Sequence, residues 1–317
     1  MQYSLLNRFR GVLLGSFIGE ILGSGDGLGR VLGKATLTPP KPDDTQPSQL
    51  LLPWSQVAAC GTESLIRCGR LDLEDWVLYS GMTQPSLLLL KATASSSEAG
   101  VATLPIALFF HEDQAKLRQK LLEAAELWQH DSKADESVLA VAFAIALALT
   151  EKLDFATLIP RTLAYLGTSP APLVQQLEQV QTLLEQGAGL DRTLTQLHQG
   201  TQRKGTSLGR PYLPIALAFY CFLSTPEDFR LCVTRAARSG YQSQTTATLT
   251  GALAGAYNSI IGLPVGWCLA ANRITTSVQR LQQVERLFAV WSGAYDVSTA
   301  DQCHRVAVAA PRVIQPR

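Results

Sequence analysis

The chain has 317 residues, of which 46% are hydrophobic and 17% charged, and its formal net charge is +1. This composition predicts a compact globule with a large apolar core and excludes a disordered chain. Because the sequence has no basic excess and no basic cluster, neither nucleic acid nor an anionic membrane is expected as its main partner.

The first residues resemble a secretory leader only in outline. Arg8 and Arg10 precede an apolar stretch, but Glu20 and Asp26 are foreign to a signal peptide. The six cysteines are Cys60, Cys68, Cys221, Cys232, Cys268 and Cys303. Their spacing matches neither a zinc site nor a small disulfide scaffold, so we expect reduced thiols in a cytoplasmic protein.

Helical periodicity runs through most of the sequence. The segments that carry it are 55–68, 114–129, 136–150, 173–185, 214–223 and 278–290. A further helix start is predicted at Ser224 and Thr225, with Pro226 in the first turn. Alternating strand patterns are rare, so the predicted fold class is all-α.

Two apolar stretches invite a membrane interpretation. Residues 138–149 are too few for the roughly 20 residues that a bilayer requires. The stretch between Arg238 and Arg273 has no charged residue but contains many polar ones. Both are therefore predicted to be central helices of a bundle.

The segment 36–53 is rich in proline and cannot form a regular helix. It is predicted to be a long surface loop. Because it joins two helical stretches and not two independent cores, we predict a single domain over residues 1–317.

Glycines recur with helical spacing at both ends of the chain. Gly11, Gly15, Gly19 and Gly23 stand four residues apart and therefore fall near one stripe of a helix. Each glycine costs a helix about 1 kcal/mol relative to alanine, so the stripe predicts close approach by another backbone. The pair Gly251 and Gly255 makes the helix around it the candidate partner.

Several stretches of the sequence are similar to motifs of one enzyme family. The run from Arg8 to Gly23 is similar to an opening helix that ends in Gly-Asp-Ala-Leu-Gly, with Glu20 at the aspartate position. Gln242-Ser243-Gln244-Thr245-Thr246, followed by 251–256, Pro264 and Trp267, is similar to an Asp-x-Asp-Thr helix with a trailing Ile-Pro-x-x-Trp. Residues 55–76 and 211–240 match further segments. On these motifs the chain resembles the ADP-ribosylglycohydrolases, and the resemblance implies a single-domain orthogonal helical bundle.

The chain departs from this family at the metal-binding positions. The resemblance implies two magnesium ions held by aspartate pairs and threonine hydroxyls of the first and last motifs. Here Leu52, Pro53 and Trp54 stand at the Thr-Asp-Asp positions. Gln242 and Gln244 replace the other two aspartates, which leaves Ser55 and Thr245 as the matching hydroxyls. Since magnesium prefers carboxylate ligands, we expect no metal, no cofactor and no catalytic residue.

Other acidic residues could in principle take the place of the missing aspartates. Asp43 and Asp44 precede a threonine, but their place between prolines is typical of a solvated loop. Glu20 and Asp26 could form a residual acid pair, which is too small a set for two ions. Residues 95–98 keep a polar loop where the family has a Gly-Asn-Gly turn.

Three functions follow as hypotheses. The first is a non-catalytic relative that binds an ADP-ribose-like small molecule or a protein partner. Its expected cleft is lined by Glu20, Trp54, Ser55, Gln56, Gln242, Gln244 and Thr245. Trp54 would stack on a ligand ring or, as we favour, plug the vacated metal site. The second is an active hydrolase that cleaves the glycosidic bond of ADP-ribosylated proteins or small molecules with displaced acids. The third is a structural or interaction protein without a ligand cleft.

Overall fold

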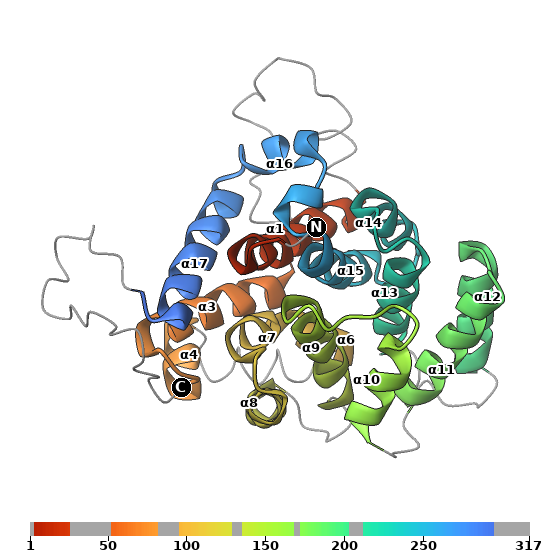
Figure 1. Cartoon of the computed structure of the whole chain (residues 1–317), viewed down its shortest axis with the longest axis horizontal. Helices are drawn as coiled ribbons and strands as arrows, with labels where there is room; N and C mark the ends of the chain where they lie inside the picture. The colour runs from red at the N-terminus through yellow and green to blue at the C-terminus, as the bar shows by residue number, and fades with distance from the viewer. Residues whose placement is uncertain are drawn as a thin grey trace, which may run out of the picture.

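A computed structural model of the chain describes residues 3–25, 52–81, 95–128, 135–167, 172–202 and 212–294. Within these ranges every regular element is a helix and no strand occurs (Figure 1). The predicted all-α class is therefore confirmed.

In chain order the elements are α1 (Leu5–Gly23), α3 (Pro53–Cys68), α4 (Leu73–Tyr79), α6 (Ser96–Ala102), α7 (Leu104–Phe110), α8 (Gln114–Trp128), α9 (Asp135–Leu149), α10 (Leu158–Leu166), α11 (Pro172–Glu185), α12 (Leu190–Gln202), α13 (Leu213–Ser224), α14 (Phe229–Ala237), α15 (Ser243–Asn258), the 3-10 helix η3 (Ile260–Gly262), α16 (Val265–Ala271) and α17 (Thr275–Ser292).

The six segments with helical periodicity correspond to α3, α8, α9, α11, α13 and α17, each close to its predicted bounds. At the end of the proline-rich segment the prediction needs a correction, because Pro53 is the first residue of α3. A proline fits there, because the N–H groups of the first helical residues have no acceptor within the helix. The part of this segment at 36–51, with Asp43 and Asp44, lies outside the described residues.

The predicted helix start at Ser224 and Thr225 is wrong. Ser224 is the last residue of α13, and α14 begins only at Phe229. The cap is Asp228, whose carboxylate accepts the N–H of Leu231 at 2.9 Å. An aspartate that satisfies a free N–H of the first turn fixes the helix start more strongly than a proline that only tolerates it.

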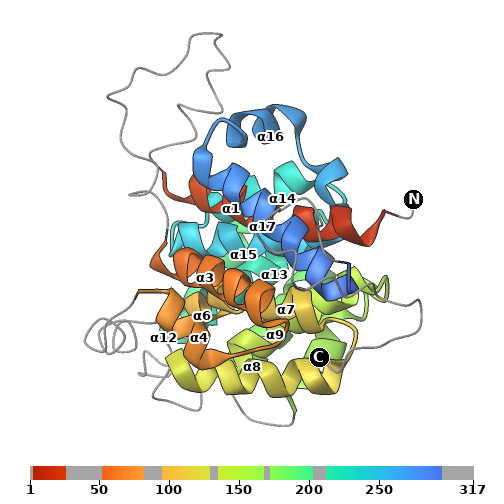
Figure 2. The ribbon, with the colours of Figure 1, turned by 90° about the vertical axis from the view of Figure 1, so that its left-hand side faces the viewer.

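The helices α1 and α15 lie side by side at the centre of the molecule (Figures 1 and 2). A Cβ atom added to Gly15 would lie 2.3 Å from the carbonyl oxygen of Gly251, and one added to Gly251 would lie 2.1 Å from that of Gly15. Gly11 meets Gly255 in the same way. The order of these pairs shows that the two helices run antiparallel. The predicted backbone approach, and its partner, are confirmed.

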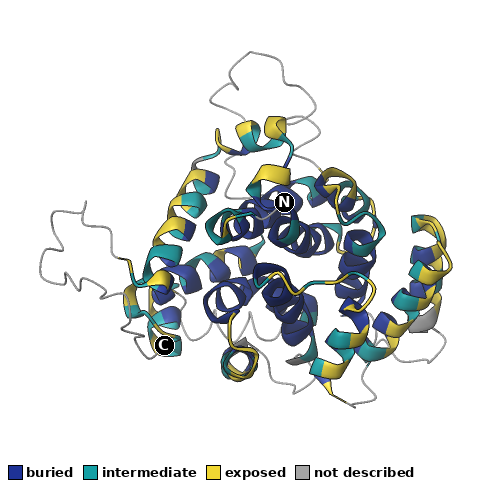
Figure 3. Cartoon of the chain, viewed as in Figure 1, coloured by how far each residue is buried: buried dark blue, intermediate teal, exposed yellow. Residues whose placement is uncertain are grey.

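Burial follows the same arrangement, with the central helices buried and the outer ones partly exposed (Figure 3). All of 138–149 in α9 is buried, as predicted for a central helix. The uncharged stretch after Arg238 is central only in part. It forms α15, but it continues into α16, where Val265 is 72% and Leu269 60% exposed.

One cluster of buried hydrophobic side chains extends from Phe9 in α1 to Trp291 in α17. This shared core supports the single-domain organisation, which stays a prediction. Within the described ranges no helix combines the length and the apolarity needed to cross a membrane. The described cysteines are free thiols, as predicted, whereas Cys303 lies outside the described residues.

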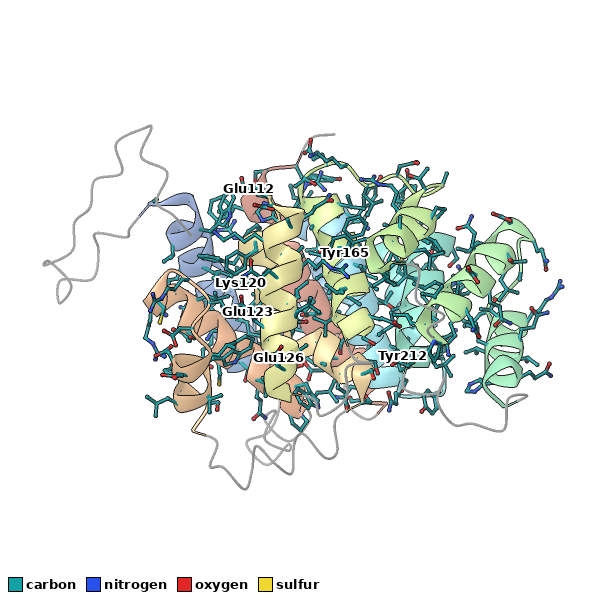
Figure 4. All side chains as sticks on the ribbon, turned by 90° about the horizontal axis from the view of Figure 1, so that it is seen from below. Glu112, Lys120, Glu123, Glu126, Tyr165 and Tyr212 are labelled. Carbon is teal, nitrogen blue, oxygen red and sulfur yellow. The ribbon has the colours of Figure 1, made fainter. Side chains whose placement is uncertain are left out.

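On a further face of the bundle α8 packs against α7 and α9 (Figure 4). The ring of Tyr165 in α10 stacks on Phe143 of α9 with centroids 4.2 Å apart. Arg118 of α8 donates a hydrogen bond to the Tyr165 carbonyl. Lys120 and Glu123 form an ion pair of 2.7 Å on α8 itself. The buried side chains of α8, among them Leu117 and Leu121, attach its apolar side, while the Arg118 guanidinium and the Tyr165 hydroxyl, which donates to the Gln114 carbonyl at 3.1 Å, connect it to α10.

The glycine contact leads to a first prediction. Gly15→Ala or Gly251→Ala forces the two backbones apart and should lower the free energy of unfolding by about 2 kcal/mol or more, measured by urea denaturation. Gly266→Ala in α16 is the matched control, because a Cβ there meets nothing within 4 Å. This control should be neutral or stabilising by up to about 1 kcal/mol. Equal effects at Gly15 and Gly266 would contradict the close contact.

Candidate functional site

The carboxyl end of α1 lies against the amino end of α15. A Cβ atom added to Gly23 would come within 2.5 Å of the Cα atom of Gln244. The Ser243 hydroxyl donates a hydrogen bond of 2.8 Å to the Gly23 carbonyl. Glu20, one turn before Gly23, is therefore held next to the first turn of α15.

Glu20 is fully buried, with 0% of its surface exposed. One carboxylate oxygen accepts the backbone N–H of Leu52 at 2.5 Å. The other forms an ion pair of 3.4 Å with Arg280 of α17. Leu52 is the cap residue of α3 and its side chain makes no capping hydrogen bond. Glu20 therefore accepts the N–H of the cap residue itself, which is the role that a glutamate in the first turn has in a capping box.

Opposing effects act on the ionisation of Glu20. Burial raises the pKa of its carboxyl group above the ordinary value, because removal from water penalises the charged form. The guanidinium of Arg280, the Leu52 N–H and the neighbouring Ser55 hydroxyl each lower the pKa, and burial is the largest effect. The charged form of the Glu20 carboxyl is thus disfavoured by burial and stabilised by polar groups close to it, above all the Arg280 guanidinium.

The first turn of α3 divides into buried and exposed residues. Trp54 is 3% exposed and belongs to the hydrophobic core, and Ser55 is equally buried. Gln56, the next residue, is exposed. The indole therefore packs inside the protein in this structure, and Gln56 faces solvent.

The first turn of α15 keeps its polar groups accessible. Gln242 is exposed and has φ 40° and ψ 46°, a left-handed conformation that is unusual for a residue with a side chain. Its side-chain oxygen accepts a hydrogen bond of 3.3 Å from the Ser97 hydroxyl of α6. Gln244 is partly exposed, whereas Thr245 is buried.

The structure thus brings the predicted residues together in two groups. Glu20 joins the amino end of α3 through the Leu52 N–H. Gln242 joins α6 through Ser97, and α6 packs against both α3 and α15. Residues 95–98, predicted as a polar loop, instead begin α6, with the Glu98 carboxylate accepting the N–H of Ser95 at 2.8 Å.

Sequence reasoning missed two residues of this region. Arg280 stands 260 positions after its partner Glu20, and no motif marks it. Tyr241 precedes Gln242, and its ring lies edge-on to His198 of α12 with centroids 5.8 Å apart. The sequence feature that could have pointed to Tyr241 is its place as an aromatic residue directly before the polar first turn of α15.

Acidic and metal-ligating side chains are sparse around these helix ends. Across the described ranges no group of three or more His, Cys, Asp or Glu residues is placed to hold a metal ion. Asp26, Asp43 and Asp44, which were weighed as substitutes for the missing acids, lie outside those ranges.

Comparison with known proteins places the chain in a family. A family model described as ADP-ribosylglycohydrolase matches residues 1–296. The chain belongs to the ADP-ribosylglycohydrolase family. A solved structure titled "ADP-ribosylglycohydrolase-related protein complex" is similar with a TM-score of 0.61 and 19% sequence identity, covering 90% of this chain and 99% of that one. This likeness supports the bundle fold of the family. No curated protein matches the sequence.

The left-handed Gln242 gives a second prediction for this family member. Gln242→Gly and Gln242→Ala both remove the amide that contacts Ser97, but only glycine relieves the positive φ. Gln242→Gly should therefore exceed Gln242→Ala in free energy of unfolding by about 1 kcal/mol, measured by urea denaturation. A more stable alanine variant would show that residue 242 is not strained.

Proposed function

We propose that this chain is a non-catalytic ADP-ribosylglycohydrolase that acts by binding an ADP-ribose-like small molecule or a protein partner. The observation that carries the proposal is the state of Glu20. It is the acid that α1 brings to the helix ends, and it is already engaged by Leu52 and Arg280.

The donor groups at these helix ends do not fit a pair of magnesium ions. Magnesium requires hard oxygen ligands with near-octahedral geometry, commonly including carboxylates. The first turn of α3 offers a proline and a buried indole, and that of α15 offers neutral amides. The Glu98 carboxylate of α6 is engaged by the Ser95 hydroxyl, at 2.8 Å, as well as by its N–H. No metal-assisted step is therefore proposed for this chain.

The exposed polar residues support a binding role. Gln56, Gln242 and Gln244 are accessible, and an amide can both donate and accept hydrogen bonds without adding charge. Such groups suit sugar hydroxyls, phosphate oxygens or a polar protein surface. Glu20, Ser55 and Thr245 are buried, so we assign them to support of the helix ends and not to ligand contact.

The same family also supports an active hydrolase as the second candidate function. Its activity would require acids from the segments around Asp26, Asp43 and Asp44, which the described residues do not include. The two candidates differ in their demand for metal ions, so a magnesium measurement separates them.

A third prediction tests this difference. Titration of the chain with magnesium in a calorimeter should give no saturable heat, and ADP-ribosylated protein should not be hydrolysed with or without magnesium. The physical reason is that neutral side chains cannot offset the charge of two divalent ions. Saturable two-site binding, or release of ADP-ribose, would overturn the proposal in favour of the active hydrolase.

Ligand binding itself is tested by a thermal shift with ADP-ribose. A ligand that binds only the folded state stabilises it by about 2.7 kcal/mol at a hundredfold excess over Kd, so the melting temperature should rise. Gln242→Ala combined with Gln244→Ala should reduce the rise. Gln119→Ala, an exposed glutamine on α8, is the control and should leave it unchanged. If ADP-ribose does not raise the melting temperature of the wild-type chain, a protein partner remains as the proposed ligand.

Trp54 provides a fifth prediction. If the indole plugs the core, Trp54→Ala should lower the free energy of unfolding by about 3–5 kcal/mol. Trp54→Phe should fold and still show the ADP-ribose shift, because the ring does not touch ligand. Gln56→Ala, at an exposed neighbour, should change stability by only about 0.5 kcal/mol. A folded Trp54→Phe variant that loses the ADP-ribose shift would show that Trp54 stacks on the ligand.

A further inference from the structure

Arg280 is the cation that reaches the buried carboxylate at the helix ends. Its Nη1 atom lies 3.4 Å from Oε2 of Glu20, and its side chain is only 11% exposed. The guanidinium carbon lies 5.1 Å from the centroid of the Phe17 ring, within range of a cation–π contact. The arginine is thus held by a charge and by an aromatic ring, both on α1.

A carboxylate without exposure to water needs a compensating cation and hydrogen-bond donors, since an isolated buried charge is strongly unfavourable. Glu20 has the Leu52 N–H as donor and Arg280 as cation. The pair joins three helices, because Glu20 belongs to α1, Leu52 caps α3 and Arg280 belongs to α17. In a metal-dependent site, a bound ion would link carboxylates from several helices in a similar manner.

We propose that Arg280 is a tethered cation that balances the charge of Glu20 and positions it to cap α3, so that these helix ends are held together without a metal ion. The proposal deepens the proposed function and rests on it only in treating this region as metal-free. Arg280 is a positioning residue in this account, since it acts through Glu20 and touches no ligand.

A second ion pair on α17 offers a matched control. Glu285 pairs with Arg10 of α1 at 2.6 Å, and the two side chains are 51% and 29% exposed. Water screens such a pair, so its loss should matter little. The helices α1 and α17 therefore share one ion pair that is closed off from water and one that is open to it.

The experiment is a double-mutant cycle read by melting temperature. Arg280→Met should lower the melting temperature by about 5 °C or more, because it leaves Glu20 buried without a cation. Arg280→Met in a Glu20→Gln background should lose much less, and Arg280→Lys should retain most of the wild-type value because it keeps the charge. The pair Arg10→Met and Glu285→Gln should show little coupling.

Rescue by Arg280→Lys is the readout that packing alone would not move, because lysine restores the positive charge without the shape of the guanidinium. If Arg280→Met does not fold, the comparison of Arg280→Lys with Arg280→Gln carries the test, with the lysine variant expected to be the more stable.

The outcomes separate the two proposals. Equal losses from Arg280→Met in both backgrounds, or an Arg280→Lys variant no more stable than Arg280→Met, would overturn the role of Arg280 and leave the proposed function intact. Stabilisation of the wild-type chain by magnesium, or its destabilisation by EDTA, would instead count against the proposed function.

Discussion

The whole arrangement depends on the contact between the backbones of α1 and α15. Glycines on both helices bring main-chain atoms to distances that a single Cβ would prevent. The contact fixes the register of the two helices as well as their separation, because Gly11, Gly15 and Gly19 each meet a set position of α15. The carboxyl end of α1 consequently lies at the amino end of α15, where the family motifs converge.

At these helix ends a side chain of the protein balances the buried negative charge of Glu20. Leu52 cannot cap α3 with its own side chain, and Glu20 accepts its N–H from another helix. That carboxylate is buried, so its charge depends on the guanidinium of Arg280. The start of α3 is thus held by an acid of α1 and a base of α17 together.

The sequence predicted the helices and their central contact because both rest on short-range patterns. Apolar spacing marked α9 and α13, and glycine spacing marked α1 with α15. It could not predict Arg280, whose partner lies 260 positions away. The start of α14 was misplaced because Asp228 outcompetes the Ser-Thr-Pro signal, and the exposure of α16 was missed because absence of charge was taken as burial. The left-handed Gln242 has no sequence signal, since glutamine rarely adopts that conformation.

The first turns of α3 and α15, where we predict that the family's metal ligands are missing, differ in burial. On α3, Trp54 is part of the core. On α15, Gln242 is exposed and accepts a hydrogen bond from the Ser97 hydroxyl. Its left-handed backbone conformation costs about 1–3 kcal/mol, and such strain is concentrated at ligand sites, which favours the proposed binding role for this turn. The glycine frame meets this turn through the backbone, because Gly23 faces the Cα atom of Gln244, and therefore does not dictate which side chains stand there.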